Sequence, residues 1–283
     1  MDHMKPSTFF LAALLILLSS AAWSTQSSAT NSENRPSERP IAGGLALIDL
    51  DRDDPTRKAT YQGEQVLIRE TESGWQAVVG IALDAETGKH ELEVDGETLS
   101  FTVQEHDYRA QYITIAEEDM VSPPEHKLER IFAEQDEIRS AFRSREVEAQ
   151  PRLDLHIPVA DARVSAEFGV RRYINEQPRN PHNGLDLAAP TGTPIAAAEA
   201  GKVVEKGDYY FNGKSVFIDH GAGLVTMYCH MDEIDVAKGD WVERGEQIGT
   251  VGKTGRVTGA HLHFSVILNG NTVDPELFLE EAP

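Results

Sequence analysis

Short segments of alternating apolar and polar residues, separated by glycine-containing turns, constrain the fold of this chain more than any other feature. In the C-terminal half these segments are 201–205, 215–219, 224–229, 247–251 and 262–268. A period of two residues predicts β-strands, because successive side chains point to opposite faces of a strand. Regular short strands of this kind predict an open β-barrel or a curled antiparallel sheet over residues 153–283.

The N-terminal half shows the same alternation in shorter runs. Asp95-Gly96 lies between the last two runs, and an Asp-Gly pair supplies the positive φ angles of a two-residue type I′ hairpin turn. We therefore expect residues 41–118 to form a small antiparallel β-sandwich. His90 and His106 have no second ligand at metal-binding spacing, so no catalytic site is expected there.

The pattern changes to helical spacing between the two β-rich regions. Residues 119–152 are expected to form a linker that contains an amphipathic helix. Its apolar positions are Leu128, Ile131, Phe132, Ile138 and Phe142. Packing within the chain is the favoured role of this apolar face, and packing against a partner helix is the alternative.

The first 40 residues are expected to stay outside the folded core. Lys5, the apolar run 9–18 and the small residues 20–22 have the order of an export signal, so residues 1–22 are interpreted as a cleaved signal peptide. An uncleaved anchor is the alternative, but the apolar stretch is shorter than the roughly 20 residues of a spanning helix. Residues 23–40 are polar and predict a disordered tether.

Charge and cysteine content exclude several classes of partner and site. The chain has 47 acidic against 26 basic residues and a formal net charge of −21, which disfavours binding to nucleic acid and to anionic lipid surfaces. Cys229 is the only cysteine, so no internal disulfide and no cysteine-based metal site can form. A metal ion would have to bind to histidines and carboxylates.

Three local segments carry the residues that suggest chemistry: His182 with Asp186, His230 after Cys229, and His261-Leu262-His263. Residues i and i+2 of a strand share a face, so both histidines of the third segment are expected to point the same way. A catalytic zinc needs three protein ligands and an open position, which a His-Asp-His set would satisfy. The two remaining histidines would be free to transfer protons near pH 7.

Longer stretches around these residues resemble the lysostaphin-type zinc metallopeptidases, a family of peptidoglycan endopeptidases. The resemblance is carried by residues 168–172, 182–194, 218–221 and 254–264. It implies that His182, Asp186 and His263 are zinc ligands and that His230 and His261 form the catalytic pair. The sequence departs from the usual family pattern at Ser265, where Glu is common, and at Ala260, where Pro is common.

The N-terminal half also resembles the immunoglobulin-like domain that precedes the catalytic unit in some members of that family. The implied function is a zinc metalloendopeptidase, exported to the periplasm, that cleaves peptidoglycan peptides by zinc-activated water with help from two histidines. A protein partner that regulates activity through the N-terminal domain is a further expectation. The alternatives are a non-catalytic regulator of another wall hydrolase and a secreted peptidase that acts on proteins.

Two other residues in the C-terminal half could be mistaken for part of the site. Cys229 precedes His230 directly, so its side chain should point to the opposite face of the strand, away from the site. We expect a buried apolar role for it. His220 is expected at a strand end with a structural role.

Overall fold

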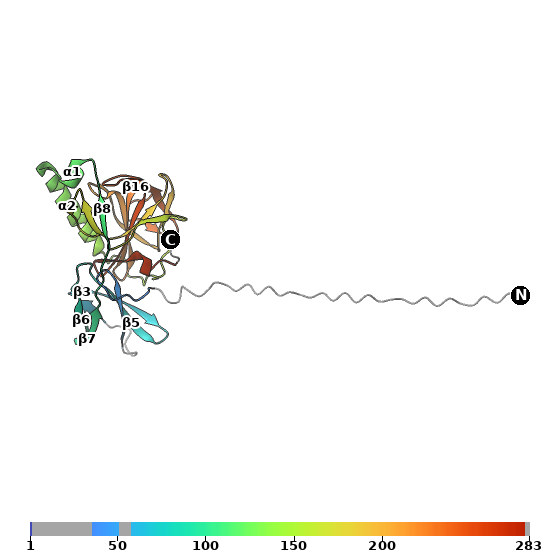
Figure 1. Cartoon of the computed structure of the whole chain (residues 1–283). Coiled ribbons are helices and arrows are strands. Elements are labelled where there is room, and N and C mark those ends of the chain that lie inside the picture. The colour runs from blue at the N-terminus through green and yellow to red at the C-terminus, as the bar shows by residue number, and fades with distance from the viewer. Residues whose placement is uncertain (2–35, 51–57, 281–283) are drawn as a thin grey trace. The chain divides into compact units, whose positions relative to one another are not determined.

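The computed structural model of the chain describes residue 1 and residues 36–50 and 58–280 (Figure 1). The predicted signal peptide, apart from Met1, lies outside the described residues, as does the predicted tether up to residue 35. The description below concerns the described part of the chain only.

The last residues of the predicted tether, 36–40, contact the C-terminal end of the chain. The amide of Ser37 donates to the carbonyl of Leu277 at 2.9 Å, and Nη1 of Arg39 lies 3.0 Å from Oδ2 of Asp274. The composition of this stretch predicted disorder, because it holds too few apolar residues to repay the entropy of ordering. Hydrogen bonds and an ion pair to a distant segment supply the contacts instead.

Two small antiparallel sheets form the N-terminal sandwich. One has the strand order β1-β5-β4 and the other the order β3-β2-β6-β7. Apolar side chains from both sheets join in one buried cluster. The strands are β1 Leu45–Leu50, β2 Ala59–Tyr61, β3 Glu64–Gln65, β4 Leu67–Thr71, β5 Gly74–Gly80, β6 Gly88–Val94 and β7 Glu97–Val103.

The Asp-Gly turn of this sandwich is confirmed. Asp95 has φ +50° and Gly96 has φ +90°, and the turn joins β6 to β7 with Val94 opposite Glu97. Positive φ at both central residues is the requirement of a type I′ turn, whose twist matches that of the strands.

A ten-stranded antiparallel sheet dominates the C-terminal region, as the alternating pattern predicted. Its main path has the order β17-β14-β15-β16-β19-β12-β9, with β13, β18 and β20 paired beside it. The path ends at β17 and β9, which do not pair, so the sheet is open. The strands are β9 Arg163–Ala166, β12 Leu185–Ala188, β13 Pro194–Ala196, β14 Gly201–Tyr209, β15 Gly213–Gly221, β16 Leu224–Ile234, β17 Trp241–Val242, β18 Gln247–Val251, β19 Leu262–Leu268 and β20 Asn271–Val273, and the short helix η2 spans Pro275–Leu277.

The central strand β16 is buried on both faces. Leu224 and Tyr228 belong to the main core, whereas Val225, Met227 and Cys229 belong to a second cluster on the other face. This division follows from the alternation of side chains along a strand. A strand covered on both faces can be apolar almost throughout.

Two helices precede this sheet: α1, Glu118–Val121, and α2, Glu125–Phe142. Ile138 and Phe142 of α2 pack against the second cluster, so the helix is used within the chain. The expectation for Phe132 was wrong, because its side chain is 58% exposed. No helix of the described residues is long and apolar enough to cross a membrane.

The strand β8, Ala110–Ile113, does not join the N-terminal sandwich in which the sequence placed it. It pairs in parallel with β10, Arg171–Ile174, which also pairs with β11, Gln177–Pro178. Asn175 holds the end of this pairing, since its carboxamide accepts from the amide of Ile115 and donates to its carbonyl, both at 2.9 Å. The alternating pattern indicates a strand but does not identify a partner strand.

The sandwich and the large sheet share a core. Leu45, Leu67 and Val78 of the sandwich are buried in the same cluster as residues of the large sheet. Polar contacts reinforce this cluster: the carboxamide of Asn269 accepts from the amide of Gly80 at 2.7 Å and donates to its carbonyl at 3.0 Å.

Candidate metal centre

Three polar side chains from separate segments of the chain come close together at the large sheet. Asp186 lies on β12 and His263 lies on β19, directly opposite each other in the antiparallel pairing. His182 precedes β12, and its position is fixed by two backbone hydrogen bonds with Gly169 and Val170. All three residues are buried.

The ligand atoms of the three residues form a tight triangle. Oδ1 of Asp186 lies 2.8 Å from Nε2 of His182 and 2.8 Å from Nδ1 of His263. The two nitrogens are 3.0 Å apart. Each residue therefore offers one atom to the same small volume, as the ligands of one metal ion would.

Each of these histidines directs one ring nitrogen at the triangle. The hydrogen bond of its other ring nitrogen shows which of the two carries the proton. Nδ1 of His182 lies 2.6 Å from the carbonyl oxygen of Glu167, which can only accept, so this nitrogen carries the proton. Nε2 of His182 then presents a lone pair. Nε2 of His263 lies 3.0 Å from the hydroxyl of Ser265, which can accept its proton and leave the lone pair of Nδ1 facing inward.

Three acceptors that face one another without a donor need a shared cation. Burial raises the pKa of Asp186, but the adjacent rings of His182 and His263 outweigh burial and hold that pKa well below its usual value. Burial also lowers the pKa of His263 to about 4, so its ring is neutral at pH 7. A carboxylate and two neutral imidazoles, with an open side toward a pocket, fit a catalytic divalent metal ion.

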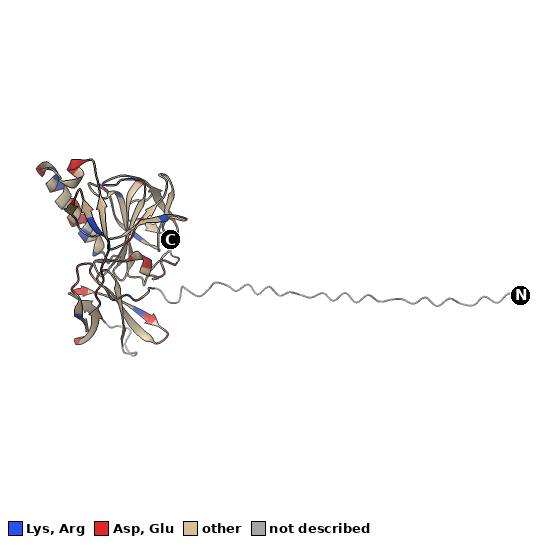
Figure 2. Ribbon diagram, in the orientation of Figure 1, with Lys and Arg blue, Asp and Glu red and all other residues tan. Residues whose placement is uncertain are grey.

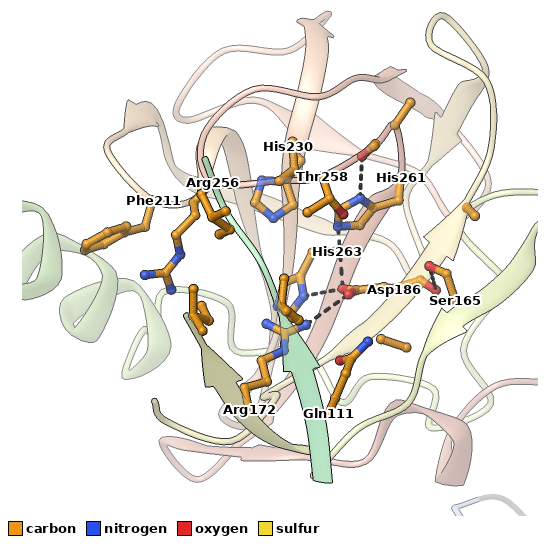
Figure 3. Close-up of a pocket in the computed structure, with 18 of the residues that line it drawn as sticks. Gln111, Ser165, Arg172, Asp186, Phe211, His230, Arg256, Thr258, His261 and His263 are labelled. Carbon is orange, nitrogen blue, oxygen red and sulfur yellow. Dashed lines mark hydrogen bonds and ion pairs between the residues drawn. The ribbon is translucent and has the colours of Figure 1, made fainter. Parts of the chain in front are cut away.

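His230 and His261 lie side by side on the pocket wall above this triangle (Figure 3). Their ring centroids are 4.9 Å apart. Nδ1 of His230 donates to the carbonyl of Thr254 at 2.9 Å, and Nδ1 of His261 donates to that of Gly259 at 2.8 Å. Both rings therefore direct the lone pair of Nε2 away from these carbonyls, and Nε2 of His261 lies 3.8 Å from Oδ1 of Asp186.

The backbone of His230 is strained. Its φ angle is +63°, a conformation that is unusual for a residue other than glycine. It lies where the register between β15 and β16 shifts. Burial, followed by repulsion from His263 and His261, lowers the pKa of His230 to about 3. Strained residues of this kind cluster at functional sites.

The structure therefore brings together all five residues that the sequence singled out. Four of them line one cavity of about 390 Å³: Asp186, His230, His261 and His263. His182 contacts Asp186 but is not among the residues that line the cavity. Cys229 is buried in an apolar cluster, as expected, and burial raises the pKa of its thiol to about 11. The expected direction of its side chain was wrong: Cys229 lies directly opposite His263 in the pairing of β16 with β19, so the two side chains share a face of the sheet, and Nδ2 of Asn212, which lines the cavity, lies 3.3 Å from its Sγ. His220 lies outside the cavity and contacts Thr226 and Ala200.

Sequence reasoning assigned no role to several residues that line the same cavity. Arg172 and Arg256 lie inside stretches that carried the family resemblance, so the sequence could place them near the site. It could not show that their side chains point into the cavity. Gln111 comes from β8, about 70 residues before His182, and no local pattern connected it to the site. In Figure 3 it lies below Asp186, and it lines the same cavity.

Comparisons with known proteins identify families and structures that this chain resembles. The sequence profile of Peptidase family M23 matches residues 180–275, and that of the Peptidase family M23 N-terminal domain matches residues 38–106. A crystal structure of a peptidase M23 from Pseudomonas aeruginosa is similar with a TM-score of 0.71 and 40% identity. The similarity covers 88% of this chain and 98% of that one.

Curated relatives match part of this chain, and two of them illustrate the similarity. The peptidoglycan DD-endopeptidase ShyA of Vibrio cholerae is 43% identical over 113 residues, which are 40% of this chain and 26% of that protein. The DD-carboxypeptidase/endopeptidase Mpg of Neisseria meningitidis is 41% identical over 118 residues, which are 42% of this chain and 27% of that protein. The matched region thus spans about a quarter of the length of these relatives.

The triangle predicts which substitutions remove the metal. We expect the purified protein to bind about one divalent ion per chain, and the variants His182→Ala and His263→Ala to retain much less than one. His230→Ala and His261→Ala should retain the ion, because their side chains lie outside the triangle. Elemental analysis after dialysis measures this content, and full metal retention in His182→Ala would contradict the assignment.

Proposed function

Because the chain belongs to peptidase family M23, we propose that it is a zinc metalloendopeptidase that is exported and hydrolyses peptide bonds of bacterial peptidoglycan. The observation that carries the proposal is the convergence of His182, Asp186 and His263 beside His230 and His261 in one cavity. The names of the relatives from V. cholerae and N. meningitidis support peptidoglycan as the substrate.

Zinc is the metal that this ligand set favours. Two imidazole nitrogens and one carboxylate oxygen are a ligand combination found in catalytic zinc sites, where a fourth position stays open. A zinc ion bound there would lower the pKa of a bound water to about 7 and polarise the scissile carbonyl. Asp186 is the only carboxylate among the described residues that line the cavity.

His230 and His261 are the residues that would transfer protons. Each presents the lone pair of Nε2, because each donates its Nδ1 proton to a backbone carbonyl. A neutral imidazole can accept a proton from the attacking water and can return it to the leaving amine. As an imidazolium it can also stabilise negative charge that develops on the carbonyl oxygen. Either histidine can fill either role.

The relatives are named as a DD-endopeptidase and a DD-carboxypeptidase/endopeptidase, and these names favour cross-links between D-amino acids as the scissile bonds. Peptide stems and polyglycine bridges suit the same chemistry. A non-catalytic regulator of another wall hydrolase would be expected to lack part of the ligand set, whereas this chain has all five residues. A secreted peptidase that acts on proteins remains the second enzymatic alternative.

Substitution of the proposed catalytic residues tests the function directly. The wild-type protein loaded with zinc should release muropeptides from purified sacculi. His182→Ala should abolish release because it loses the metal, and His261→Ala should lower the rate by about 10²- to 10⁴-fold because it loses proton transfer while it keeps the metal. Chromatography of the soluble fragments measures the release.

His126→Ala is the matched control, because this histidine lies on α2, is exposed and does not line the cavity. Its activity should equal that of the wild type. Full activity of His261→Ala would contradict the proposed role. Glycine-rich proteins assayed beside sacculi distinguish a protein-directed peptidase, and wild-type protein that binds zinc but cleaves neither substrate would favour the regulator.

We also propose that the protein is exported to the periplasm. The support is the sequence of residues 1–22, which has the basic, apolar and small-residue parts of a signal peptide in the correct order. Expressed in a Gram-negative host, the full chain should be found in the periplasmic fraction with a new N-terminus near Trp23. A cytoplasmic protein that retains Met1 would contradict the proposal.

We further propose that a protein partner regulates access to the cavity through the N-terminal region. The support is that Gln111 and Ile113 of β8 line the cavity, so movement of β8 away from β10 would widen it. Tyr112 and Tyr173 are register partners across this pair, and their rings stack at 4.9 Å. A disulfide at these positions would hold the two strands together.

The double variant Tyr112→Cys with Tyr173→Cys tests whether β8 must move for the substrate to enter the cavity. Under oxidising conditions it should cleave sacculi at least about 10-fold more slowly than under reducing conditions, because β8 could no longer move. Each single variant is the control for oxidation itself and for loss of the tyrosine. Equal rates in the oxidised and reduced double variant would contradict a moving β8.

A further inference from the structure

The cavity has the opposite charge from the rest of the molecule. The chain carries a net charge of −21, and acidic residues are spread over the ribbon, including α1 (Figure 2). The described residues that line the cavity nevertheless include three arginines, Arg163, Arg172 and Arg256, against the single carboxylate of Asp186. A bound divalent ion would add further positive charge. A cavity with this charge attracts anionic groups.

Arg172 uses only part of its hydrogen-bonding capacity within the protein. One guanidinium nitrogen, Nη2, donates to Oδ2 of Asp186 at 3.0 Å. Its Nε is buried and has no hydrogen-bond partner among the described residues. The side chain is only 23% exposed, so water has limited access to these unused donors. A buried donor without a partner is costly, and a shift of this side chain toward the cavity would let a ligand oxygen relieve that cost.

Arg256 is positioned by an aromatic ring and a backbone carbonyl and not by a counter-ion. Its guanidinium lies 4.3 Å from the centre of the Phe211 ring, and Nη1 donates to the carbonyl of Met120 at 3.3 Å. Among the described residues, no carboxylate forms an ion pair with it. Burial, and then repulsion from Arg172 and Arg179, lowers the pKa of Arg256 to about 10, so it remains charged at neutral pH.

These two arginines belong to the same part of the cavity wall. Figure 3 shows Arg172 directed at Asp186 and Arg256 beside Phe211. The planar guanidinium of arginine matches a carboxylate in a two-point hydrogen-bonded pair. Arg256 has no acidic partner within the described part of the chain and stacks on the ring of Phe211, so its guanidinium can bind a carboxylate of a ligand.

We propose that Arg172 and Arg256 form a carboxylate-binding subsite that holds a free carboxylate of the substrate peptide next to the scissile bond. This inference rests on the proposed endopeptidase function, because it assigns specificity to the same cavity. Substrates with a free carboxylate near the cleaved bond bind better than otherwise identical substrates in which that carboxylate is a carboxamide. Arg256 is the residue to test, since Arg172 also contacts the metal ligand Asp186.

The test compares two forms of one substrate, cross-linked muropeptide dimers with free carboxylates and the same dimers after conversion of the carboxylates to carboxamides. For the zinc-loaded wild type, KM should be about 10- to 100-fold lower with the free form. In Arg256→Gln this preference should disappear through a rise in KM for the free form, with kcat little changed. Arg256→Lys should restore part of it, because it restores the charge but not the two-point geometry.

Arg171→Gln is the matched control, because it removes the same charge from a neighbouring exposed residue that pairs with Asp107 and does not line the cavity. It should keep the wild-type preference. Zinc content must be equal in all variants, which separates loss of the subsite from loss of the metal. An unchanged preference in Arg256→Gln, or an equal loss with both substrates, would overturn the subsite.

The two proposals fail in different ways. A wild type that cleaves both forms equally well overturns the subsite and leaves the endopeptidase function intact. A wild type that cleaves neither form overturns the function, and titration calorimetry with the same dimers then decides the subsite. Tighter binding of the free form that is lost in Arg256→Gln supports it, and equal Kd values for the two forms overturn it.

Discussion

The site depends on the register between β12 and β19. Asp186 lies opposite His263 in this antiparallel pair, which places Oδ1 of the carboxylate 2.8 Å from Nδ1 of the ring. A shift of one residue would turn either side chain to the other face of the sheet and separate the two atoms. The buried residues around them, including Leu185, Leu187 and Phe264, fix this register because the same shift would expose them. The packing of the core therefore also fixes the geometry of the site.

Backbone carbonyls then determine what the histidines can do. Those of Glu167, Thr254 and Gly259 each accept the Nδ1 proton of one histidine, and all three histidines present the lone pair of Nε2. His263 differs, because it directs Nδ1 at the triangle and uses Nε2 toward the hydroxyl of Ser265. Ser265 thus supplies a neutral hydrogen-bond partner to this histidine, where a carboxylate would supply a charged one.

Segments that are distant in sequence complete the wall of the cavity. β8 comes from the N-terminal half but lies beside β10, and it contributes Gln111 and Ile113 to the cavity. The sandwich is held to the large sheet by a shared core and by the contacts of Asn269 with Gly80. A displacement of β8 would therefore change the shape of the cavity.

The sequence by itself determined the elements that depend on local information. Alternation of apolar residues predicted the strands, Asp95-Gly96 predicted a type I′ turn, and helical spacing predicted α2. The five residues of the site were found because they lie in specific motifs and because residues i and i+2 of a strand share a face. Only the tertiary structure decided the partner of β8, the anchoring of residues 36–40, the exposure of Phe132 and the direction of Arg172 and Arg256 into the cavity. The physical reason is that strand pairing, burial and side-chain direction depend on which distant segments meet, and local propensity carries no information about those partners.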